Sequence, residues 1–176
     1  MCLIEYYTYE DYKNWEGNWE LIRGMPLAMA PSPVISHQIV ATNIATELNS
    51  NKKCEECIAV MEEDWIIEED TVVKPDVSFI CSIESDFIIK PPEIVVEVVS
   101  KSTAKRDEKI KKEIYEKEGV KYYILVYPNF LKARIFKNEN GFKKVGEFSK
   151  ETFEFNLPCK TKIDFEKVFK ILRRRK

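Results

Sequence analysis

The pattern of hydrophobic and polar positions predicts strands alternating with two long helices. Residues 36–48 repeat apolar side chains at the spacing of one helical face, with Ser36 as the expected N-cap. The apolar positions of this face are Ile39, Val40, Ile44 and Leu48. The segment therefore predicts a helix that packs one side against a core.

A strand–helix–strand unit is predicted in the second half of the chain. The β-branched run at 94–99 is typical of a strand that is buried on both faces. Residues 102–118 then predict a helix whose Ile110 and Ile114 face the sheet, and Gly119 ends this helix. A strand follows directly, so the unit predicts a right-handed crossover onto a mixed sheet.

The remaining segments are shorter. They predict a short helix or turn at 6–15, two strands around an Arg-Gly turn at 19–29, and an interruption of regular secondary structure at Pro31-Ser32-Pro33. Strands follow at 58–67, 71–81 and 121–127, then a hairpin of 131–137 with 142–148, and a helix at 164–175. No repeat or linker divides the sequence. We therefore expect one mixed α/β domain across residues 1–176, with a central mixed β-sheet flanked by helices.

Composition limits the class of protein. The chain has 176 residues, 44% of them apolar, and 28 Lys and Arg residues against 30 Asp and Glu residues, which gives a net charge of −2. These values suit one globular domain and show no general attraction to nucleic acid. No stretch approaches about 18 uninterrupted apolar residues, which excludes a membrane-spanning helix. We see no signal peptide at the N-terminus, so we expect a cytoplasmic protein with no membrane partner.

The charge is unevenly distributed along the chain. Residues 55–70 carry eight acidic residues and no basic one, so this strip cannot lie on a phosphate backbone. Residues 101–112 carry six basic and two acidic residues and can contact phosphates. Residues 160–176 carry eight basic and two acidic residues and form a candidate phosphate clamp, although a solvated helix end is the favoured interpretation.

The five cysteines form no obvious disulfide or metal pattern. Cys54 and Cys57 are spaced as Cys-x-x-Cys, which is half of a zinc site or a redox motif. Cys2, Cys81 and Cys159 supply no second pair, and the Cys-x-x-Cys lies in a polar stretch rather than at the start of a helix. We therefore expect free thiols in a reducing compartment.

Two carboxylates interrupt apolar strands. Glu97 lies inside the run at 94–99, and Asp76 follows Pro75, which interrupts the strand at 71–81. An unpaired buried charge is costly, so each carboxylate needs a partner or a ligand. Two carboxylates on neighbouring strands suit Mg²⁺, which takes one or two carboxylates together with water and a substrate phosphate. The alternative to a metal site, which we weigh evenly for the pair, is that Asp76 lies in a turn and that Glu97 is paired with an Arg.

The helix at 102–118 adds a candidate lysine. Lys111 lies four residues from both Asp107 and Tyr115 and one position from Ile110, at the boundary of the side that faces the sheet. A lysine there can orient water and stabilise charge that develops on phosphate. The other basic residues of this helix are expected to form a solvated face. Motifs for nucleotide binding and for serine hydrolases are absent from the sequence.

Several of these segments together resemble the Uma family, whose members are described as "putative restriction endonucleases" within the PD-(D/E)XK nuclease superfamily. The resemblance covers about residues 6–130 and rests on motifs in matching order and spacing. They are Trp19-Glu20-Leu21-Ile22-Arg23-Gly24, Met29-Ala30-Pro31-Ser32-Pro33, Lys74-Pro75-Asp76-Val77, Ile94-Val95-Val96-Glu97-Val98-Val99-Ser100, Ser102-Thr103, Arg106-Asp107, Lys111, Tyr115 and Gly119-Val120-Lys121-Tyr122-Tyr123-Ile124-Leu125-Val126.

The resemblance implies a restriction-endonuclease-like core and a metal-dependent nuclease site. It implies that Asp76 and Glu97 bind Mg²⁺ or Mn²⁺. It also implies that Lys111 replaces the lysine that the superfamily places two residues after the glutamate, where this chain has Val99. Glu20 matches an acidic position that joins the metal ligands in related nucleases, and a surface strand residue is the alternative interpretation.

Four further residues match accessory positions of the family. His37 is expected to orient other groups or to support the structure rather than to act as a general base. Ser100 and Asp107 are expected to support the ligands or to cap the helix. Tyr115 belongs to the same motif as Lys111.

The resulting hypothesis is a Mg²⁺-dependent DNA endonuclease whose catalytic residues are Asp76, Glu97 and Lys111. A homodimer is expected, because two active sites serve to cut both strands. The alternatives are a non-catalytic nuclease-fold module that binds nucleic acid or a partner protein, and an accessory protein of a mobile element. Retention of all three residues favours catalysis.

Overall fold

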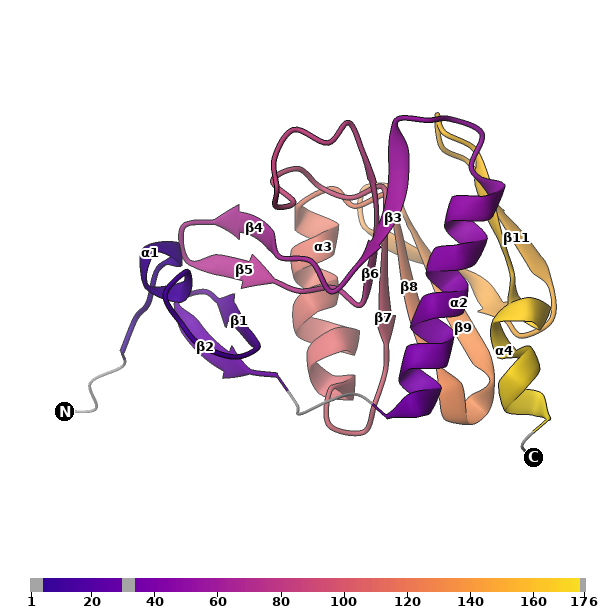
Figure 1. Ribbon diagram of the computed structural model, residues 1–176, viewed down its shortest axis with the longest axis horizontal. Coiled ribbons are helices and arrows are strands. Elements are labelled where there is room, and N and C mark those ends of the chain that lie inside the picture. The colour runs from indigo at the N-terminus through magenta and orange to yellow at the C-terminus, as the bar shows by residue number, and fades with distance from the viewer. Residues whose placement is uncertain (1–4, 30–33, 175–176) are drawn as a thin grey trace.

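The computed structural model describes residues 5–29 and 34–174. A six-stranded mixed sheet stands at its centre (Figure 1). Its strands are β3 (Cys57–Met61), β6 (Val77–Cys81), β7 (Ile94–Val98), β8 (Tyr122–Tyr127), β9 (Lys132–Asn138) and β10 (Phe142–Phe148), in the order β10-β9-β8-β7-β6-β3. Strands β7 and β8 are parallel and every other neighbouring pair is antiparallel, which confirms the expected mixed sheet.

Helices cover both faces of this sheet. Helix α2 (Ile35–Asn51) and helix α4 (Phe165–Arg173) lie on one face, and the π-helical turn η1 (Arg106–Lys111) continues into helix α3 (Lys112–Lys117) on the other (Figure 1). All five residues of β7 are buried, as predicted for a strand covered on both sides. Within the described residues, no helix has the length and apolar character needed to cross a membrane.

A smaller antiparallel sheet packs beside α3 (Figure 1). Its strands are β1 (Trp19–Ile22), β2 (Met25–Ala28), β4 (Trp65–Glu68) and β5 (Thr71–Val73), in the order β2-β1-β5-β4. The ring of Trp65 stacks on that of Tyr115 from α3, with 5.6 Å between their centroids. Helix α1 (Tyr9–Tyr12) closes the end of this sheet by burying Tyr12 against Leu21 and Val72.

Two segments predicted as single strands each divide between the two sheets. The predicted strand at 58–67 consists of β3 and β4, and the predicted strand at 71–81 consists of β5 and β6. Glu62 adopts a positive φ of 52°, which turns the chain after β3, and Pro75 cannot donate a hydrogen bond to a strand ladder. The chain therefore leaves the central sheet and returns to it, which places the small sheet beside Asp76.

The start of α2 also differs from the prediction. The helix begins at Ile35, and Val34 occupies the N-cap position that Ser36 was expected to take. The predicted apolar face is confirmed, since Val40, Ile44 and Leu48 are fully buried. The break at Pro31-Ser32-Pro33 lies outside the described residues.

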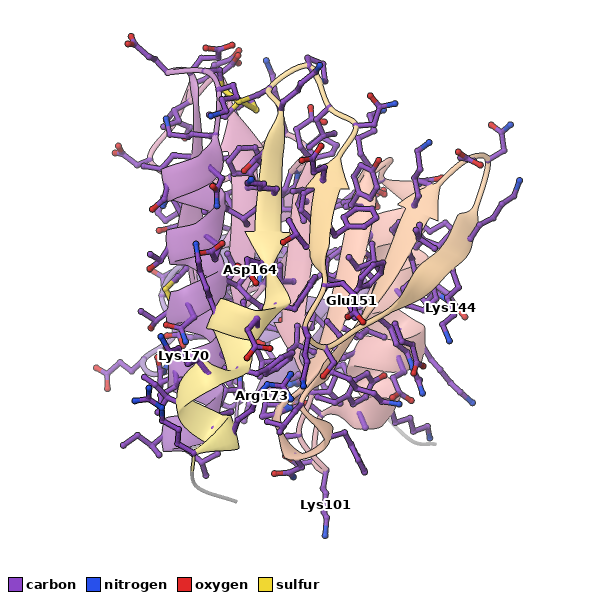
Figure 2. The ribbon with its side chains drawn as sticks, turned by 90° about the vertical axis from the view of Figure 1, so that its right-hand side faces the viewer. Lys101, Lys144, Glu151, Asp164, Lys170 and Arg173 are labelled. Atoms are coloured by element: carbon purple, nitrogen blue, oxygen red, sulfur yellow. A yellow bond between two sulfur atoms is a disulfide. The ribbon has the colours of Figure 1, made fainter. Side chains whose placement is uncertain are left out.

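The C-terminal part contains a hairpin that the sequence pattern did not predict. Strands β11 (Thr152–Phe155) and β12 (Thr161–Asp164) pair with each other and follow the predicted hairpin of β9 and β10. A short 3-10 turn, η2 (Pro128–Phe130), joins β8 to that predicted hairpin. Asp164 caps α4 by accepting hydrogen bonds from the backbone N–H of Glu166 and Lys167, and Figure 2 shows it where that helix begins.

The basic residues of the C-terminal segment differ in exposure, since Lys167 and Lys170 are exposed and Arg173 is partly buried. Figure 2 shows Lys170 and Arg173 along α4. The Arg173 guanidinium donates hydrogen bonds to the carbonyl and hydroxyl oxygens of Ser149, so it is engaged within the fold. Arg175 and Lys176, which were part of the candidate phosphate clamp, lie outside the described residues.

Four cysteines are paired, which overturns the expectation of free thiols. Disulfides join Cys54 to Cys159 and Cys57 to Cys81. Strands β3 and β6 are antiparallel neighbours that place Cys57 opposite Cys81, whereas the other pair spans 105 residues of sequence. The register of β3 and β6 creates the first of these neighbourhoods, and the C-terminal segment that carries Cys159 next to Cys54 creates the other. The local spacing of cysteines in the sequence reveals neither. Cys2 lies outside the described residues.

Candidate active site

An open cavity of about 620 Å³ lies at the end of β7, between the start of α2 and the loop that precedes η1. Six of the eight candidate residues line this cavity: His37, Asp76, Glu97, Ser100, Asp107 and Lys111. The other two, Glu20 and Tyr115, are buried and contact the lining residues Lys111 and Glu97. The structure thus brings all eight residues to one place.

The two strand carboxylates lie where β6 and β7 separate. Val77 pairs with Val96, so extending the register by one residue sets Asp76 opposite Glu97. The ladder stops there, because Val98 N–H donates to the Asp76 carboxylate at 2.6 Å. The Asp76 carboxylate therefore takes the place of a strand carbonyl and is held beside Glu97.

Lys111 joins two of the acids. Its Nζ atom lies 2.8 Å from Glu20 Oε1 and 2.6 Å from Glu97 Oε1. Lys111 is 1% exposed, Glu20 is 0% exposed and Glu97 is 3% exposed. A buried ammonium is thus held between two buried carboxylates, one from each sheet.

A π-helical turn gives Lys111 this position. Hydrogen bonds in η1 span five residues instead of four, so side chains rotate away from the phase of an ordinary helix. Ile110, which was predicted to face the sheet, is 39% exposed, whereas Lys111 is buried rather than at the boundary. Asp107, Lys111 and Tyr115 then share the buried side. Such π turns frequently occur at functional sites.

Burial dominates the protonation of Glu97. It raises the pKa of Glu97 well above the ordinary glutamate value, and the positive charge of Lys111 opposes this effect. The negative charges of Asp107, Asp76 and Glu20 raise the pKa further. The Tyr115 hydroxyl donates to Glu97 Oε1 at 2.7 Å, and burial also raises the pKa of Tyr115, so this hydroxyl remains a donor.

Lys111 itself stays charged. Burial alone would lower the pKa of Lys111, but the carboxylates of Glu20, Glu97 and Asp107 raise it above the ordinary lysine value. Asp107 is also buried, and burial raises the pKa of its carboxyl while Lys111 opposes the shift. Lys111 therefore acts as a fixed cation and not as a base.

Glu20 and Arg106 are buried more deeply, and contact more of the cluster, than the sequence indicated. Glu20 Oε1 accepts a hydrogen bond from Lys74 N–H at 2.9 Å, and Glu20 Oε2 lies 3.4 Å from Arg106 Nη1. The Arg106 side chain is only 19% exposed, which corrects its expected place on a solvated face. Within the described chain, Glu20 Oε2 and Arg106 Nε are buried polar atoms that lack a hydrogen-bond partner. Such atoms suit a site that binds a ligand.

His37 lies on the first turn of α2 and contacts Asp76. Its Nε2 atom is 3.2 Å from Asp76 Oδ2. Burial lowers the pKa of His37, but the hydrogen bond and the charge of Asp76 raise it more, so the net shift is upward. His37 is therefore placed to orient Asp76, in keeping with the expected supporting role.

The loop before η1 completes the rim of the cavity. Thr103 N–H donates to the Ser100 hydroxyl, and Ser100 N–H donates to the Thr103 hydroxyl, so Ser100 shapes the turn that leads into η1. Lys101 also lines the cavity, and Figure 2 shows its side chain projecting away from the body of the protein. Glu62 is the residue of the acidic strip at 55–70 that lines the cavity.

The chemistry of these side chains fits a hard divalent cation. Asp76 and Glu97 line the cavity, and Glu20 Oε2 accepts no hydrogen bond within the described residues. Carboxylate oxygen is the ligand that Mg²⁺ and Mn²⁺ prefer in proteins.

A family model matches most of the chain. A family model for Uma2, described as "Putative restriction endonuclease", matches residues 5–158. The chain belongs to the Uma2 family. This match confirms the resemblance that the sequence motifs indicated.

A solved structure shares the fold of this Uma2 chain. The crystal structure of a "putative nuclease belonging to DUF820" from Anabaena variabilis matches it with a TM-score of 0.74 and 15% sequence identity. The match covers 94% of this chain and 98% of the other, and it confirms the expected mixed α/β architecture. No curated protein matches the sequence.

Proposed function

We propose that this Uma2 chain is a metal-dependent endonuclease that hydrolyses phosphodiester bonds of DNA. The proposal rests on one observation: a buried lysine is held between two buried carboxylates at the floor of an open cavity, with a third carboxylate beside them. Strongly perturbed ionisable groups in a cleft are typical of catalytic sites. Membership in a nuclease family supports the same conclusion.

The acidic residues would hold the metal. Asp76 and Glu97 would supply ligands for Mg²⁺ or Mn²⁺, and Glu20 would add a third carboxylate. When bound, such a cation stabilises negative charge on a phosphate oxygen and lowers the pKa of a water molecule. Tyr115 and His37 fix the orientation of Glu97 and Asp76 through their contacts.

The cationic residues would act on the phosphate and the attacking water. Lys111 is charged and buried, so its ammonium can orient a water molecule and stabilise charge that develops on phosphate. Arg106 lines the same cavity, and its buried Nε atom lacks a hydrogen-bond partner in the described chain, so the guanidinium would bind a phosphate oxygen. The cavity thus offers cations for a phosphate, Lys74, Lys101, Arg106 and Lys111, beside the carboxylates of Glu62, Asp76, Glu97 and Asp107.

A plasmid assay tests the proposal. Supercoiled DNA is incubated with the protein and Mg²⁺ or Mn²⁺, with and without a chelator, and with the variants Asp76→Asn, Glu97→Gln and Lys111→Met. We expect metal-dependent nicking or linearisation that each variant reduces about 100-fold or more. Exposed Glu113 and Lys109 provide the charge-matched controls Glu113→Gln and Lys109→Met, which should cleave like the wild type.

Two results would refute the proposal. One is cleavage that survives the chelator or is equal in all variants, which would indicate a contaminating nuclease. The other is DNA binding without cleavage under every metal condition, which would favour the non-catalytic module. Calorimetric titration with Mn²⁺ measures the metal site without activity, and Asp76→Asn should weaken that binding while far-ultraviolet circular dichroism stays unchanged.

A further inference from the structure

A second cluster of metal-ligand side chains lies away from the cavity. The sulfur atoms of Cys54, Cys57 and Cys159 lie within 4.8 Å of one another, and Cys81 is bonded to Cys57. Among the described residues that line the cavity there is no cysteine. The cavity lies at the start of α2 and beside Asp76, which precedes β6. Cys54 follows the far end of the 17-residue helix α2, about 25 Å along it, and Cys81 ends β6, about 17 Å along that strand from Asp76.

Three segments that are distant in sequence supply the four sulfur atoms. Cys54 lies in the loop after α2 and Cys57 begins β3. Cys81 ends the neighbouring strand β6, and Cys159 lies in the connection between β11 and β12. The spacing of the first two, Cys-x-x-Cys, is the spacing found in structural zinc sites.

Backbone hydrogen bonds hold these segments together independently of the sulfur atoms. Lys53 N–H donates to the carbonyl of Lys160 at 2.9 Å, beside Cys54 and Cys159. Ser82 N–H donates to the carbonyl of Glu56 at 3.0 Å, next to the pair of Cys57 and Cys81. A protein with reduced cysteines would therefore keep the four side chains close to one another.

We propose that the reduced protein binds one Zn²⁺ ion through the thiolates of Cys54, Cys57, Cys81 and Cys159. Tetrahedral coordination at about 2.3 Å from zinc sets the sulfur atoms roughly 3.8 Å apart, and three of them already lie within 4.8 Å of one another. Cys57 and Cys159 are buried and Cys54 is partly buried, as in a closed structural site. Lys52 donates from Nζ to the carbonyl of Cys54, so a cation stands near the thiolates.

Electrons and protons balance when the disulfide form of the protein is converted to the zinc-bound form. Two equivalents of a phosphine or dithiol reductant deliver four electrons to the two disulfides and are themselves oxidised, and four protons convert the sulfurs to thiols. Zinc binding then releases these protons as the thiols become thiolates. A redox-active pair is disfavoured, because Cys54 and Cys57 are bonded to other partners and precede a strand rather than a helix.

The zinc site would fasten the C-terminal hairpin to the central sheet. Cys159 belongs to the β11–β12 connection, whereas Cys57 and Cys81 belong to the outer strands β3 and β6. The proposal is independent of nuclease activity, because the lengths of α2 and β6 separate the cluster from the cavity.

Cobalt spectroscopy on the full chain tests this proposal. The protein is reduced with a phosphine and titrated with Co²⁺ in the absence of oxygen, and then with Zn²⁺. We expect thiolate-to-cobalt charge transfer and tetrahedral cobalt bands that saturate at about one ion per chain and disappear on addition of about one equivalent of zinc. Elemental analysis of the protein purified with reductant should give the same stoichiometry.

Variants assign the ligands and separate the two sites. Cys54→Ser and Cys159→Ser should each reduce bound zinc to about a tenth or less, whereas Cys2→Ser should retain it. The double variant Asp76→Asn/Glu97→Gln should keep the full cobalt spectrum. The proposal is overturned if reduced wild-type protein shows no charge-transfer band, if its four sulfurs resist reduction, or if Cys159→Ser leaves the spectrum unchanged. The wild-type spectrum decides the matter even where a variant fails to fold.

Discussion

Replacing Lys111 by methionine should destabilise the protein strongly and in a pH-dependent way. Lys111→Met keeps an unbranched side chain of similar length but removes the positive charge between Glu20 and Glu97. The two carboxylates would then lie buried near each other without their shared counter-charge. We expect a loss of about 3–5 kcal/mol in the free energy of unfolding at neutral pH, the cost typical of breaking a buried ion pair.

The geometry supports this magnitude. At distances of 2.8 and 2.6 Å, each contact of Lys111 Nζ contributes about 6 kcal/mol of attraction at an effective dielectric constant near 20. Most of this attraction offsets the cost of removing three charges from water, so the intact cluster adds little net stability. The variant retains the desolvation cost of the acids and loses the attraction, and the difference is several kcal/mol.

The loss should shrink as the pH falls. Burial raises the pKa of Glu97 in the folded protein, and Lys111 opposes that shift, so removing Lys111 raises this pKa further. A carboxyl group with a raised folded-state pKa binds more protons when folded. Its contribution to stability is therefore complete below about pH 4.5 and is lost as the pH rises through the folded-state value. Lys111→Met should thus lose least stability in mild acid. For each unit by which the variant further raises the folded-state pKa of Glu97, the loss at neutral pH should exceed the loss in mild acid by about 1.4 kcal/mol.

Urea denaturation followed by tryptophan fluorescence measures this effect between pH 5 and pH 8. Lys109→Met is the matched control, because Lys109 is exposed two residues away and the variant should stay within about 0.5 kcal/mol of the wild type. The double variant Glu20→Gln/Lys111→Met should recover about 0.5–3 kcal/mol relative to Lys111→Met. A loss below about 1 kcal/mol with the pH slope of the wild type would show that Lys111 is not the shared counter-charge.

Three further predictions follow from single contacts. The chain has one histidine, so its proton NMR titration is unambiguous. The pKa of His37 should lie above 6.5 and should fall in Asp76→Asn. The contact with Asp76 should stabilise the fold fully below pH 6.5, and this stabilisation should be lost as the pH rises through the folded-state pKa. Tyr115→Phe should lower the free energy of unfolding by about 1–3 kcal/mol in urea denaturation, because Glu97 loses a buried donor. Cys54→Ser should cost about 2–5 kcal/mol in oxidised protein, by the same measurement, and close to nothing in reduced, chelator-treated protein.

The sequence predicted those parts of the site that depend on local chemistry. The run at 94–99 is apolar enough to require a fully covered strand, and a glutamate inside it had to meet a partner. Pro75 marked the end of a strand ladder, which is the reason Asp76 could be placed at the same edge. Both inferences need only the neighbouring residues.

The sequence could not predict what depends on helical phase or sheet register. Ile110 and Lys111 exchanged their expected positions because a π-helical turn interrupts the ordinary helical repeat, and side-chain periodicity carries no signal of that turn. Cys57 and Cys81 are paired by the register of two strands. The polar residues of 62–64 and the proline at 75 were available signals that the strands at 58–67 and 71–81 were divided.

The position of Glu20 supports the proposed function of the cluster. Its side chain is fully buried, it comes from the smaller sheet, and its Oε2 atom has no hydrogen-bond partner among the described residues. A buried ion cluster contributes little net stability compared with apolar residues of similar size, so stability alone gives no reason to place Glu20, Glu97 and Lys111 together. A site that must bind a cation and a phosphate requires both kinds of charge in one place. The burial of Glu20 against Lys111 is therefore what the proposed binding of a cation and a phosphate requires.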